Sequence, residues 1–332
     1  MNYMSEMGQG KAPYNVAKRS VLRPIKKERK QCMGDGIGQL FSCCNMENEA
    51  LVTSSACYVM GNQVEDAIKY AFFRVENEIL SAGGKLIGVH PMFIFPSETD
   101  EMLAAVWSKN LDLLCEETAC QVLGIDAIGS SQVKAPICML TGYGVQFADK
   151  PNVLPDWDIV AAGHTGMEGI SMLVREKREA LSKRFSFEFI EQAEAFMDQL
   201  SVRKMLAGIQ LKQPVLIHAL GEGGVMAGLW NLAERTGLGL HVYLKEIPIR
   251  QETVEISELF GLNPYQMMAD GMVFFVTLQG EELAGQIRRM GIQAHVIGKM
   301  TNKKERVIEN GEEKRFLDRP AVDEMYKAGI LV

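Results

Sequence analysis

Long apolar runs are missing from this chain. No stretch approaches the ~20 consecutive apolar residues that a helix needs to cross a bilayer. Residues 1–13 are polar and lack the apolar centre of a secretory signal peptide. We therefore expect a cytoplasmic protein that makes no contact with the membrane.

Paired cysteine motifs are missing as well. The seven cysteines are an odd number, and no two of them form a Cys-x-x-Cys pair. This pattern suggests neither a disulfide framework nor a zinc site. We expect most of the thiols to be buried as small apolar groups.

The chain carries too few cations for general affinity to nucleic acid. It has 35 Lys and Arg against 42 Asp and Glu, and its net charge is −7. The exception is residues 18–30, where seven cations face the single acidic residue Glu28. This basic arm is either a solvated segment or a segment that folds over an anionic ligand or partner, and nucleic acid is the partner we expect least.

Strand and helix patterns alternate along the first half of the chain. Its apolar and β-branched residues and its 3.6-residue apolar spacing separate the two kinds of element. The expected strands are residues 50–60, 85–95 and 135–145, and the expected helices are residues 62–84 and 97–124. The first 34 residues are expected to be irregular. Two prolines and little periodicity make residues 147–158 the expected linker.

A second alternating unit follows the linker. Ser186 is expected to cap a helix, and Gly237 to end another. The residues after 301 are expected to form a charged hairpin and a short helix. The predicted division is a basic arm at 1–34, an N-terminal domain at 35–148, a C-terminal domain at 156–300 and a charged tail at 301–332.

A glycine-rich turn precedes one helix of the second unit, in LIHALGEGGVMAGLWNLAERTGLG, residues 216–239. Such a turn can seat an anion, because the first N–H groups of a helix lack intrahelical partners. Glu222 would repel a phosphate, by about 4 kcal/mol for unit charges ~4 Å apart at an effective dielectric near 20. Two interpretations stay open, a structural turn of Gly221, Gly223 and Gly224 or a ligand loop in which Glu222 binds a cation or an amine.

Four segments of the second half resemble the AIR synthase-related (PurM-like) superfamily, and above all its hydrogenase-maturation branch. They are DIVAAGHTGMEGISMLVREKREAL, the stretch from LIHALGEGG to LKEIPI, ELFGLNPYQMMADGMVFFVTL and AHVIGKM, in the family's order and spacing. The resemblance implies a two-domain α/β (α+β) fold. Its N-terminal part would be a mixed sheet with helices that pairs with a second copy into a barrel, and its C-terminal part an α/β sandwich. A homodimer is therefore expected.

The resemblance also implies sites for ATP and magnesium, because metal ions that bridge phosphates need hard oxygen ligands. Asn77 and Glu78 stand in for the family's Asn-Asp, and Asp126 lies where the family has its His-Thr-Glu turn. Glu78 and Asp126 are the expected metal ligands. The expected cofactor-binding residues are Asn77, Glu78, Gly221, Gly223, Gly224, Lys18 and Arg19.

The sequence also departs from the family's pattern. Gln39 and Leu40 occupy places where carboxylates are expected, and residues 53–57 lack the family's Asp. The hydrogenase-maturation dehydratase uses a C-terminal cysteine, whereas no cysteine follows Cys138 here. We therefore expect that this chain does not dehydrate a carbamoyl group by that route.

His218 and Glu222 are the candidate catalytic residues. His218 ends an expected strand beside the glycine-rich loop, where the family often has a histidine, and a structural hydrogen bond is its alternative role. Glu168 matches a position that the family keeps acidic, and capping a helix is its expected role.

Two functions remain open at this point. The first is ATP-dependent activation of a carbonyl or similar oxygen by phosphoryl transfer, in a cofactor-maturation or small-molecule biosynthetic step. The second is a degenerate relative that has lost Mg-ATP catalysis and acts as a binding or regulatory partner. A nucleotide or another small molecule is the expected ligand in either case.

Overall fold

The computed structural model describes residues 14–24, 41–45, 50–60, 64–146 and 151–331. Most of the basic arm, and the departures at Gln39 and Leu40, lie outside these residues. Within them, no helix is both long and apolar enough to cross a membrane. Residues 14–22 form a short helix, α1 (Tyr14–Val16) continued by a π-helical turn (Ala17–Leu22), so the expectation of an irregular segment is wrong there.

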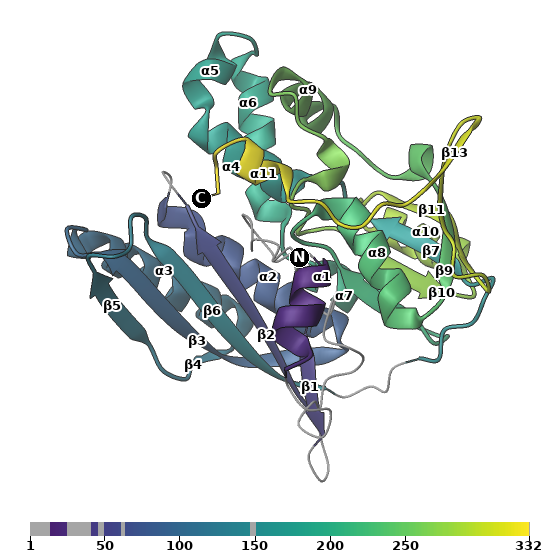
Figure 1. Ribbon diagram of the computed structural model, residues 1–332, viewed down its shortest axis with the longest axis horizontal. Helices are drawn as coiled ribbons and strands as arrows, with labels where there is room; N and C mark the ends of the chain where they lie inside the picture. Colours follow the sequence, from purple (N-terminus) through teal and green to yellow (C-terminus); the bar gives the residue numbers. More distant parts are fainter. Residues whose placement is uncertain (1–13, 25–40, 46–49, 61–63, 147–150, 332) are drawn as a thin grey trace, which may run out of the picture.

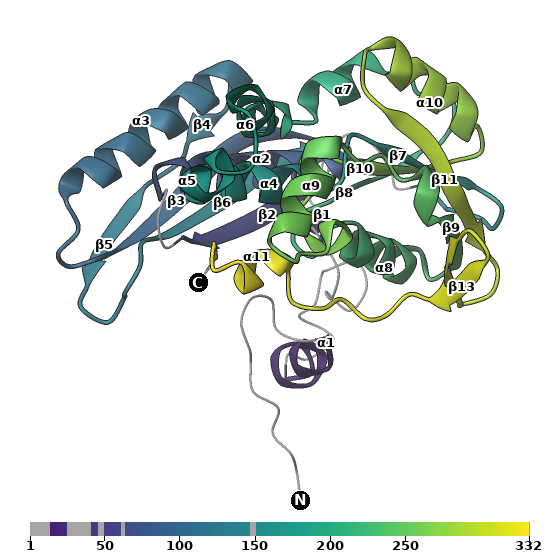
Figure 2. The ribbon, with the colours of Figure 1, turned by 90° about the horizontal axis from the view of Figure 1, so that it is seen from above.

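The first sheet is built from the first half of the chain. Its strand order is β1-β2-β6-β3-β4, and β5 pairs with β3 on the same side as β4. The strands are β1 (Ser42–Asn45), β2 (Ala50–Val59), β3 (Gly84–Pro96), β4 (Gln121–Val122), β5 (Asp126–Ser130) and β6 (Ile137–Gln146). Two helices, α2 (Ala67–Ser81) and α3 (Glu101–Thr118), cover one face of this sheet (Figures 1 and 2).

Helix α3 lies within the predicted range of residues 97–124, but it begins later, at Glu101, and ends earlier, at Thr118. Asp100 caps it by accepting a hydrogen bond from the Met102 N–H, over 2.9 Å. The helix stops at Thr118 because Ala119 adopts a left-handed conformation, with φ at 53°. The expected continuation to Gly124 is therefore wrong, and the following residues form β4 and β5.

The second sheet has the order β13-β12-β9-β11-β7-β10-β8. Its strands are β7 (Asp158–Ala162), β8 (Leu216–Ala219), β9 (Gly239–Tyr243), β10 (Val273–Thr277), β11 (Ala294–Thr301), β12 (Arg306–Asn310) and β13 (Glu313–Phe316). Helix α8 (Gly224–Thr236) shares an apolar cluster with one face, and α10 (Gly280–Arg289) with the other. The sequence VFFVT of β10 is buried throughout because both faces are covered.

The remaining helices lie between and beside the sheets. They are α4 (Met167–Glu176), α5 (Arg178–Ser182), α6 (Phe187–Glu194), α7 (Arg203–Gly208), α9 (Gln251–Leu259) and α11 (Glu324–Lys327). Ser186 caps α6 by accepting from the Phe189 N–H, and Gly237 ends α8 in a left-handed conformation, as the sequence predicts. The expected hairpin and terminal helix are also present, as β12–β13 and α11.

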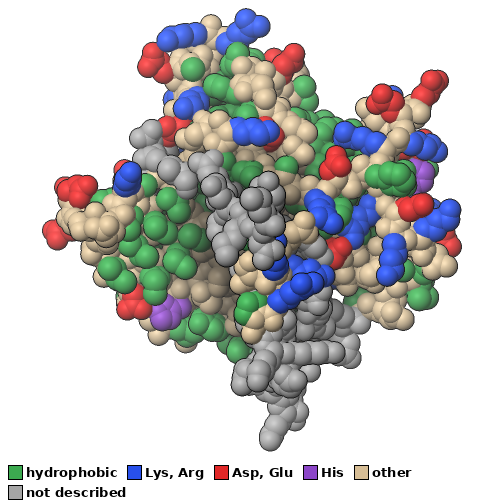
Figure 3. Space-filling model, in the orientation of Figure 1, with side chains coloured by type: hydrophobic (Ala, Val, Ile, Leu, Met, Phe, Trp, Pro, Cys, Tyr) green, Lys and Arg blue, Asp and Glu red, His purple; other side chains and the backbone are tan. Residues whose placement is uncertain are grey.

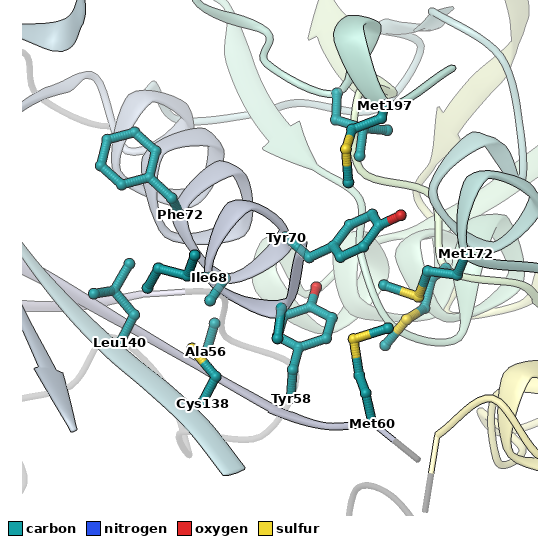
Figure 4. Packing of buried hydrophobic residues seen from close by; sticks show 14 of the residues in the cluster. Ala56, Tyr58, Met60, Ile68, Tyr70, Phe72, Cys138, Leu140, Met172 and Met197 are labelled. Carbon is teal, nitrogen blue, oxygen red and sulfur yellow. The ribbon is translucent and has the colours of Figure 1, made fainter. Parts of the chain in front are cut away.

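One apolar core joins the first sheet to the helices of the second half. Figure 4 shows Tyr58 from β2 beside Tyr70 from α2, with Met172 of α4 and Met197 close to them. The two tyrosine rings stack with their centroids 6.1 Å apart. The observed fold is therefore the mixed α/β fold with two sheets that the sequence predicts, whereas the residue limits of its domains stay a prediction.

Candidate functional site

A buried network of charges joins α2 to the second half of the chain. Arg74 of α2 places its Nη2 atom 2.9 and 3.1 Å from the two carboxylate oxygens of Glu168, in the first turn of α4. Its Nε donates to Asp270, in the turn before β10. The exposed fractions are 5% for Arg74, 0% for Glu168 and 1% for Asp270. Since water cannot solvate these buried charges, each charge is stabilised only by its partners in the network.

The network holds its charges by mutual attraction. Burial works against the Arg74 cation, but Asp270 and Glu168 outweigh it and hold the Arg74 pKa above its ordinary value. Burial raises the pKa of Asp270, although Arg74 opposes that shift. The hydroxyl of Tyr58 also donates to Glu168. Glu168 therefore accepts the hydrogen bonds of this network, which is a different role from the expected helix cap.

Asn77 and Glu78, two predicted cofactor-binding residues, are bonded to protein groups. The Asn77 amide donates to the Leu200 carbonyl over 2.8 Å and to Asp270 over 3.2 Å, and its oxygen accepts from the Val202 N–H over 3.0 Å. Glu78 accepts from the hydroxyl of Ser54 on β2. These contacts give both side chains a structural role, and their binding to a nucleotide stays a prediction.

The structure does not bring the two predicted metal ligands together. Glu78 faces β2, whereas Asp126 lies on β5, with β6 and β3 between them in the sheet. The Asp126 carboxylate lies 3.4 Å from Nε2 of His90, and its side chain is 60% exposed. In the part of the chain that the structure describes, no three His, Cys, Asp or Glu side chains are grouped to hold a metal ion. Glu78 and Asp126 therefore do not face one another in this structure, and their role as metal ligands stays a prediction.

The glycine-rich loop runs from the end of β8 to the start of α8. Gly223 and Gly224 have φ angles of 78° and 59°, which favour glycine. A Cβ on Gly224 would lie 2.3 Å from the Met267 carbonyl oxygen, and one on Gly221 would lie 2.6 Å from Cζ of Arg74. Packing therefore requires these glycines whether or not a ligand binds.

The loop does hold a carboxyl group, and this group belongs to the chain itself. The N–H of Gly223 donates to Oδ2 of Asp323 over 2.6 Å, and the N–H of Met325 donates to Oδ1 over 2.9 Å. Asp323 comes directly before α11 and is 1% exposed. Its carboxylate therefore lies at the N-terminus of α8, where the positive end of the helix dipole favours an anion.

Burial is the main influence on the Asp323 carboxyl group and raises its pKa to about 7. The N–H groups of Met325 and Gly223 lower the pKa, and the carboxylates of Glu222 and Glu168 raise it again. Burial, followed by Glu222, also raises the pKa of Cys57 and of Tyr326. The loop thus combines a positive helix end with a local excess of acidic groups.

Apolar contacts keep Asp323 in place. The side chains of Met325, Ile330 and Leu331 are at most 4% exposed, and Leu331 forms a β-bridge with Met60. Figures 1 and 2 show α11 in front of the region between β2 and α8. The sequence contains a weak signal for this contact, since an Asp before a short helix is a typical cap, but it cannot show a partner 100 residues away.

The predicted catalytic residues lie near the loop in different environments. His218 is fully buried on β8, opposite Phe274 of β10, and a ligand could reach it only if its neighbours moved. Glu222 is half-buried in the loop itself. Lys18 and Arg19 lie on the π-helical turn that follows α1. Helix α1 itself contacts the C-terminal segment, because Arg319 donates a hydrogen bond to Asn15 over 3.0 Å. The catalytic and nucleotide-binding roles of these residues stay predictions.

Residues missed by the sequence reasoning complete the site. The sequence pattern does not identify Arg74, Asp270 or Asp323, although they hold α2, the β10 turn and α11 against the loop. Only the Asp-Gly pair at 270–271 is a visible turn signal.

Comparison with known proteins assigns the fold. Residues 158–310 match the family model "AIR synthase related protein, C-terminal domain". A predicted hydrogenase expression/formation protein of Methanocaldococcus jannaschii is 26% identical over 260 residues, which are 74% of each chain.

Solved structures show the same architecture over both halves. The hydrogenase maturation protein HypE of E. coli has a TM-score of 0.69 at 16% identity, over 83% of this chain and 88% of that one. A HypE structure in complex with ATP has a TM-score of 0.63 at 14% identity, over 96% and 97% of the two chains. Residues 158–310 therefore carry a domain of the AIR synthase-related family, and the chain over both halves shares the fold of the hydrogenase maturation protein HypE.

Proposed function

We propose that this protein is a binding or regulatory partner in a cofactor-maturation step and that it lacks Mg-ATP catalysis. One observation carries the proposal, namely that the carboxylate of Asp323 takes the position at the start of α8 that a phosphate would need. The maturation role is supported by the hydrogenase expression/formation relative and by the match of residues 158–310 to the AIR synthase-related C-terminal domain.

The charges around the loop also oppose a nucleotide. A phosphate beside Gly223 would meet the carboxylates of both Asp323 and Glu222. Each unit charge at ~4 Å costs about 4 kcal/mol at an effective dielectric near 20. A bridging metal ion could offset this repulsion, but Glu78 is bonded to Ser54 of β2 and Asp126 lies on β5, so the two carboxylates do not face one ion.

A second candidate is the ATP-dependent enzyme, which would activate a carbonyl or similar oxygen by phosphoryl transfer. The HypE structure in complex with ATP supports it, because that fold matches this chain over nearly its whole length. Asp323 would have to leave the loop before ATP bound there. The residues assigned to this function are Asn77, Glu78, Asp126, His218, Glu222, the loop glycines and, in the arm, Lys18 and Arg19.

Calorimetric titration with ATP, with and without magnesium, separates the two candidates. For the wild-type protein we expect no magnesium-dependent binding at micromolar ATP. Magnesium-dependent binding in that range would reject the first candidate and favour the ATP-dependent enzyme. Glu78→Gln would then identify a metal ligand if it abolished the magnesium dependence and left the melting temperature unchanged.

We also propose that the protein forms a homodimer through the first sheet. The face away from α2 and α3, with the adjoining edge, exposes large apolar side chains, and Figure 3 shows them gathered over this part of the molecule. They are Ile87, Val122, Leu123, Ile125, Ile128 and Met139. A patch of this kind is typical of an interface between subunits. A monomer in sedimentation at micromolar concentration would contradict the homodimer.

A further inference from the structure

A cavity lies in the C-terminal half, away from the glycine-rich loop. It has a volume of about 220 Å³ and lies between the β7–α4 loop, the segment around α7, the start of α9 and the α10–β11 turn. Four apolar side chains line it, namely Met167, Val202, Met205 and Ile292. Figure 2 shows α7 on the side of the molecule away from α11.

The polar part of this lining is mainly cationic. Arg250 and Lys204 both line the cavity, and Asp198 is the acidic residue of the lining. Arg250 is half-buried, donates from Nη2 to Oε1 of Gln199 over 3.0 Å and lies over the ring of Phe196. Neither cation has a carboxylate within ion-pair distance among the described residues. The guanidinium of Arg250 is therefore available to pair with an anion.

The helix dipoles add positive potential to the same cavity. Arg250 is the N-cap residue of α9, which has nine residues, and Met167 is the first residue of α4. Helix N-termini favour anions and disfavour cations. Arg250 and the N-termini of α9 and α4 would therefore all favour an anion in this cavity.

His164 supplies a neutral polar group to the cavity wall. Burial, then the nearby Arg250 and His295, lower its pKa to about 4, so the imidazole is uncharged at neutral pH. It makes no hydrogen bond to any residue that the structure describes. Its ring can thus donate one hydrogen bond to an oxygen of a bound molecule.

We propose that this cavity binds a small organic carboxylate, with the carboxylate against Arg250 and an apolar body against Met167, Val202, Met205 and Ile292. The charge of Arg250 and the ends of two helices select the anion. The apolar walls select a molecule with a hydrocarbon or aromatic body over an inorganic ion. Nothing in this proposal depends on whether ATP binds at the glycine-rich loop.

Saturation-transfer NMR with benzoate tests the proposal on the full chain. We expect saturable binding of benzoate at millimolar concentration, and at least tenfold weaker binding of its neutral analogue benzyl alcohol. Arg250→Gln should weaken benzoate binding at least tenfold, whereas Arg250→Lys should stay within about threefold of the wild type. Arg289→Gln is the matched control, because Arg289 is an exposed cation of α10 outside the cavity lining.

Three results would overturn the proposal. One is the absence of saturable benzoate binding to the wild-type protein. Another is equal binding of benzoate and benzyl alcohol, which would show that the negative charge of the ligand does not contribute to binding. The third is unchanged binding to Arg250→Gln. If Arg250→Gln failed to fold, the comparison of benzoate with benzyl alcohol would still decide, since it changes the charge of the ligand and leaves the protein unchanged.

Discussion

The glycine-rich loop and the Arg250 cavity both lie at the N-terminus of a helix, but their charges are opposite. At the start of α8 the chain supplies its own anion, Asp323, with Glu222 nearby. At the start of α9 it supplies Arg250 and no carboxylate partner among the described residues. A helix end therefore does not identify a ligand site by itself, and the charges around it decide what can bind.

The buried charge network lies between these two regions. Gly221 of the loop packs against the guanidinium of Arg74, and Asp270, which binds Arg74, is followed by Gly271 in the wall of the cavity. The network therefore connects the two regions through neighbouring residues, and its integrity should determine the geometry of both.

The largest effect that we predict comes from breaking this network. Arg74→Met should lower the free energy of unfolding by about 3–5 kcal/mol, because it leaves Glu168 and Asp270 buried without their cation. Urea denaturation of the wild-type and variant proteins measures the difference.

Arg178→Met is the matched control for Arg74→Met. Arg178 also pairs with two carboxylates, Glu191 and Glu194, but it lies at the surface. Exposed pairs contribute about 0–1 kcal/mol, so this variant should remain close to the wild type. Equal losses for the two variants would contradict a special role of the buried network.

Local signals in the sequence predict much of the fold. The capping residue Ser186, the left-handed Gly237 and the turn glycines Gly223 and Gly224 act through neighbours in the chain, so their patterns are visible before folding. The family resemblance rests on segments of the second half, which is also where the family model matches. The end of α3 at Ala119 has no such signal, because alanine does not usually adopt a left-handed conformation.

The site could not be predicted in the same way. Arg74 and Asp270 are separated by 196 positions, and Gly223 and Asp323 by 100. Only the packing of α2 and α11 against the second half brings them together. The sequence argument that Glu222 opposes a phosphate agrees with the observed excess of acidic groups, but it could not show that another carboxylate already occupies the loop.

The effect per pH unit is smaller for the titration of Asp323. Its pKa is raised, so the folded protein holds the proton more tightly than the unfolded chain. This group's contribution to stability is therefore greatest below the ordinary pKa of aspartate. It decreases by up to about 1.4 kcal/mol per pH unit as the pH rises towards 7. Asp323→Asn should lack this part of the pH dependence, whereas Asp112→Asn, at an exposed position on α3, should retain it.

The most direct test of the occupied loop is an NMR titration of the backbone amides of Gly223 and Met325. If Asp323 accepts their hydrogen bonds, both resonances should shift with a midpoint near pH 7 in the wild-type protein and in Asp112→Asn, and the shift should vanish in Asp323→Asn. A Gly223 amide that titrates identically in Asp323→Asn, or that does not titrate in the wild-type protein, would contradict the claim that the chain's own carboxylate occupies this loop.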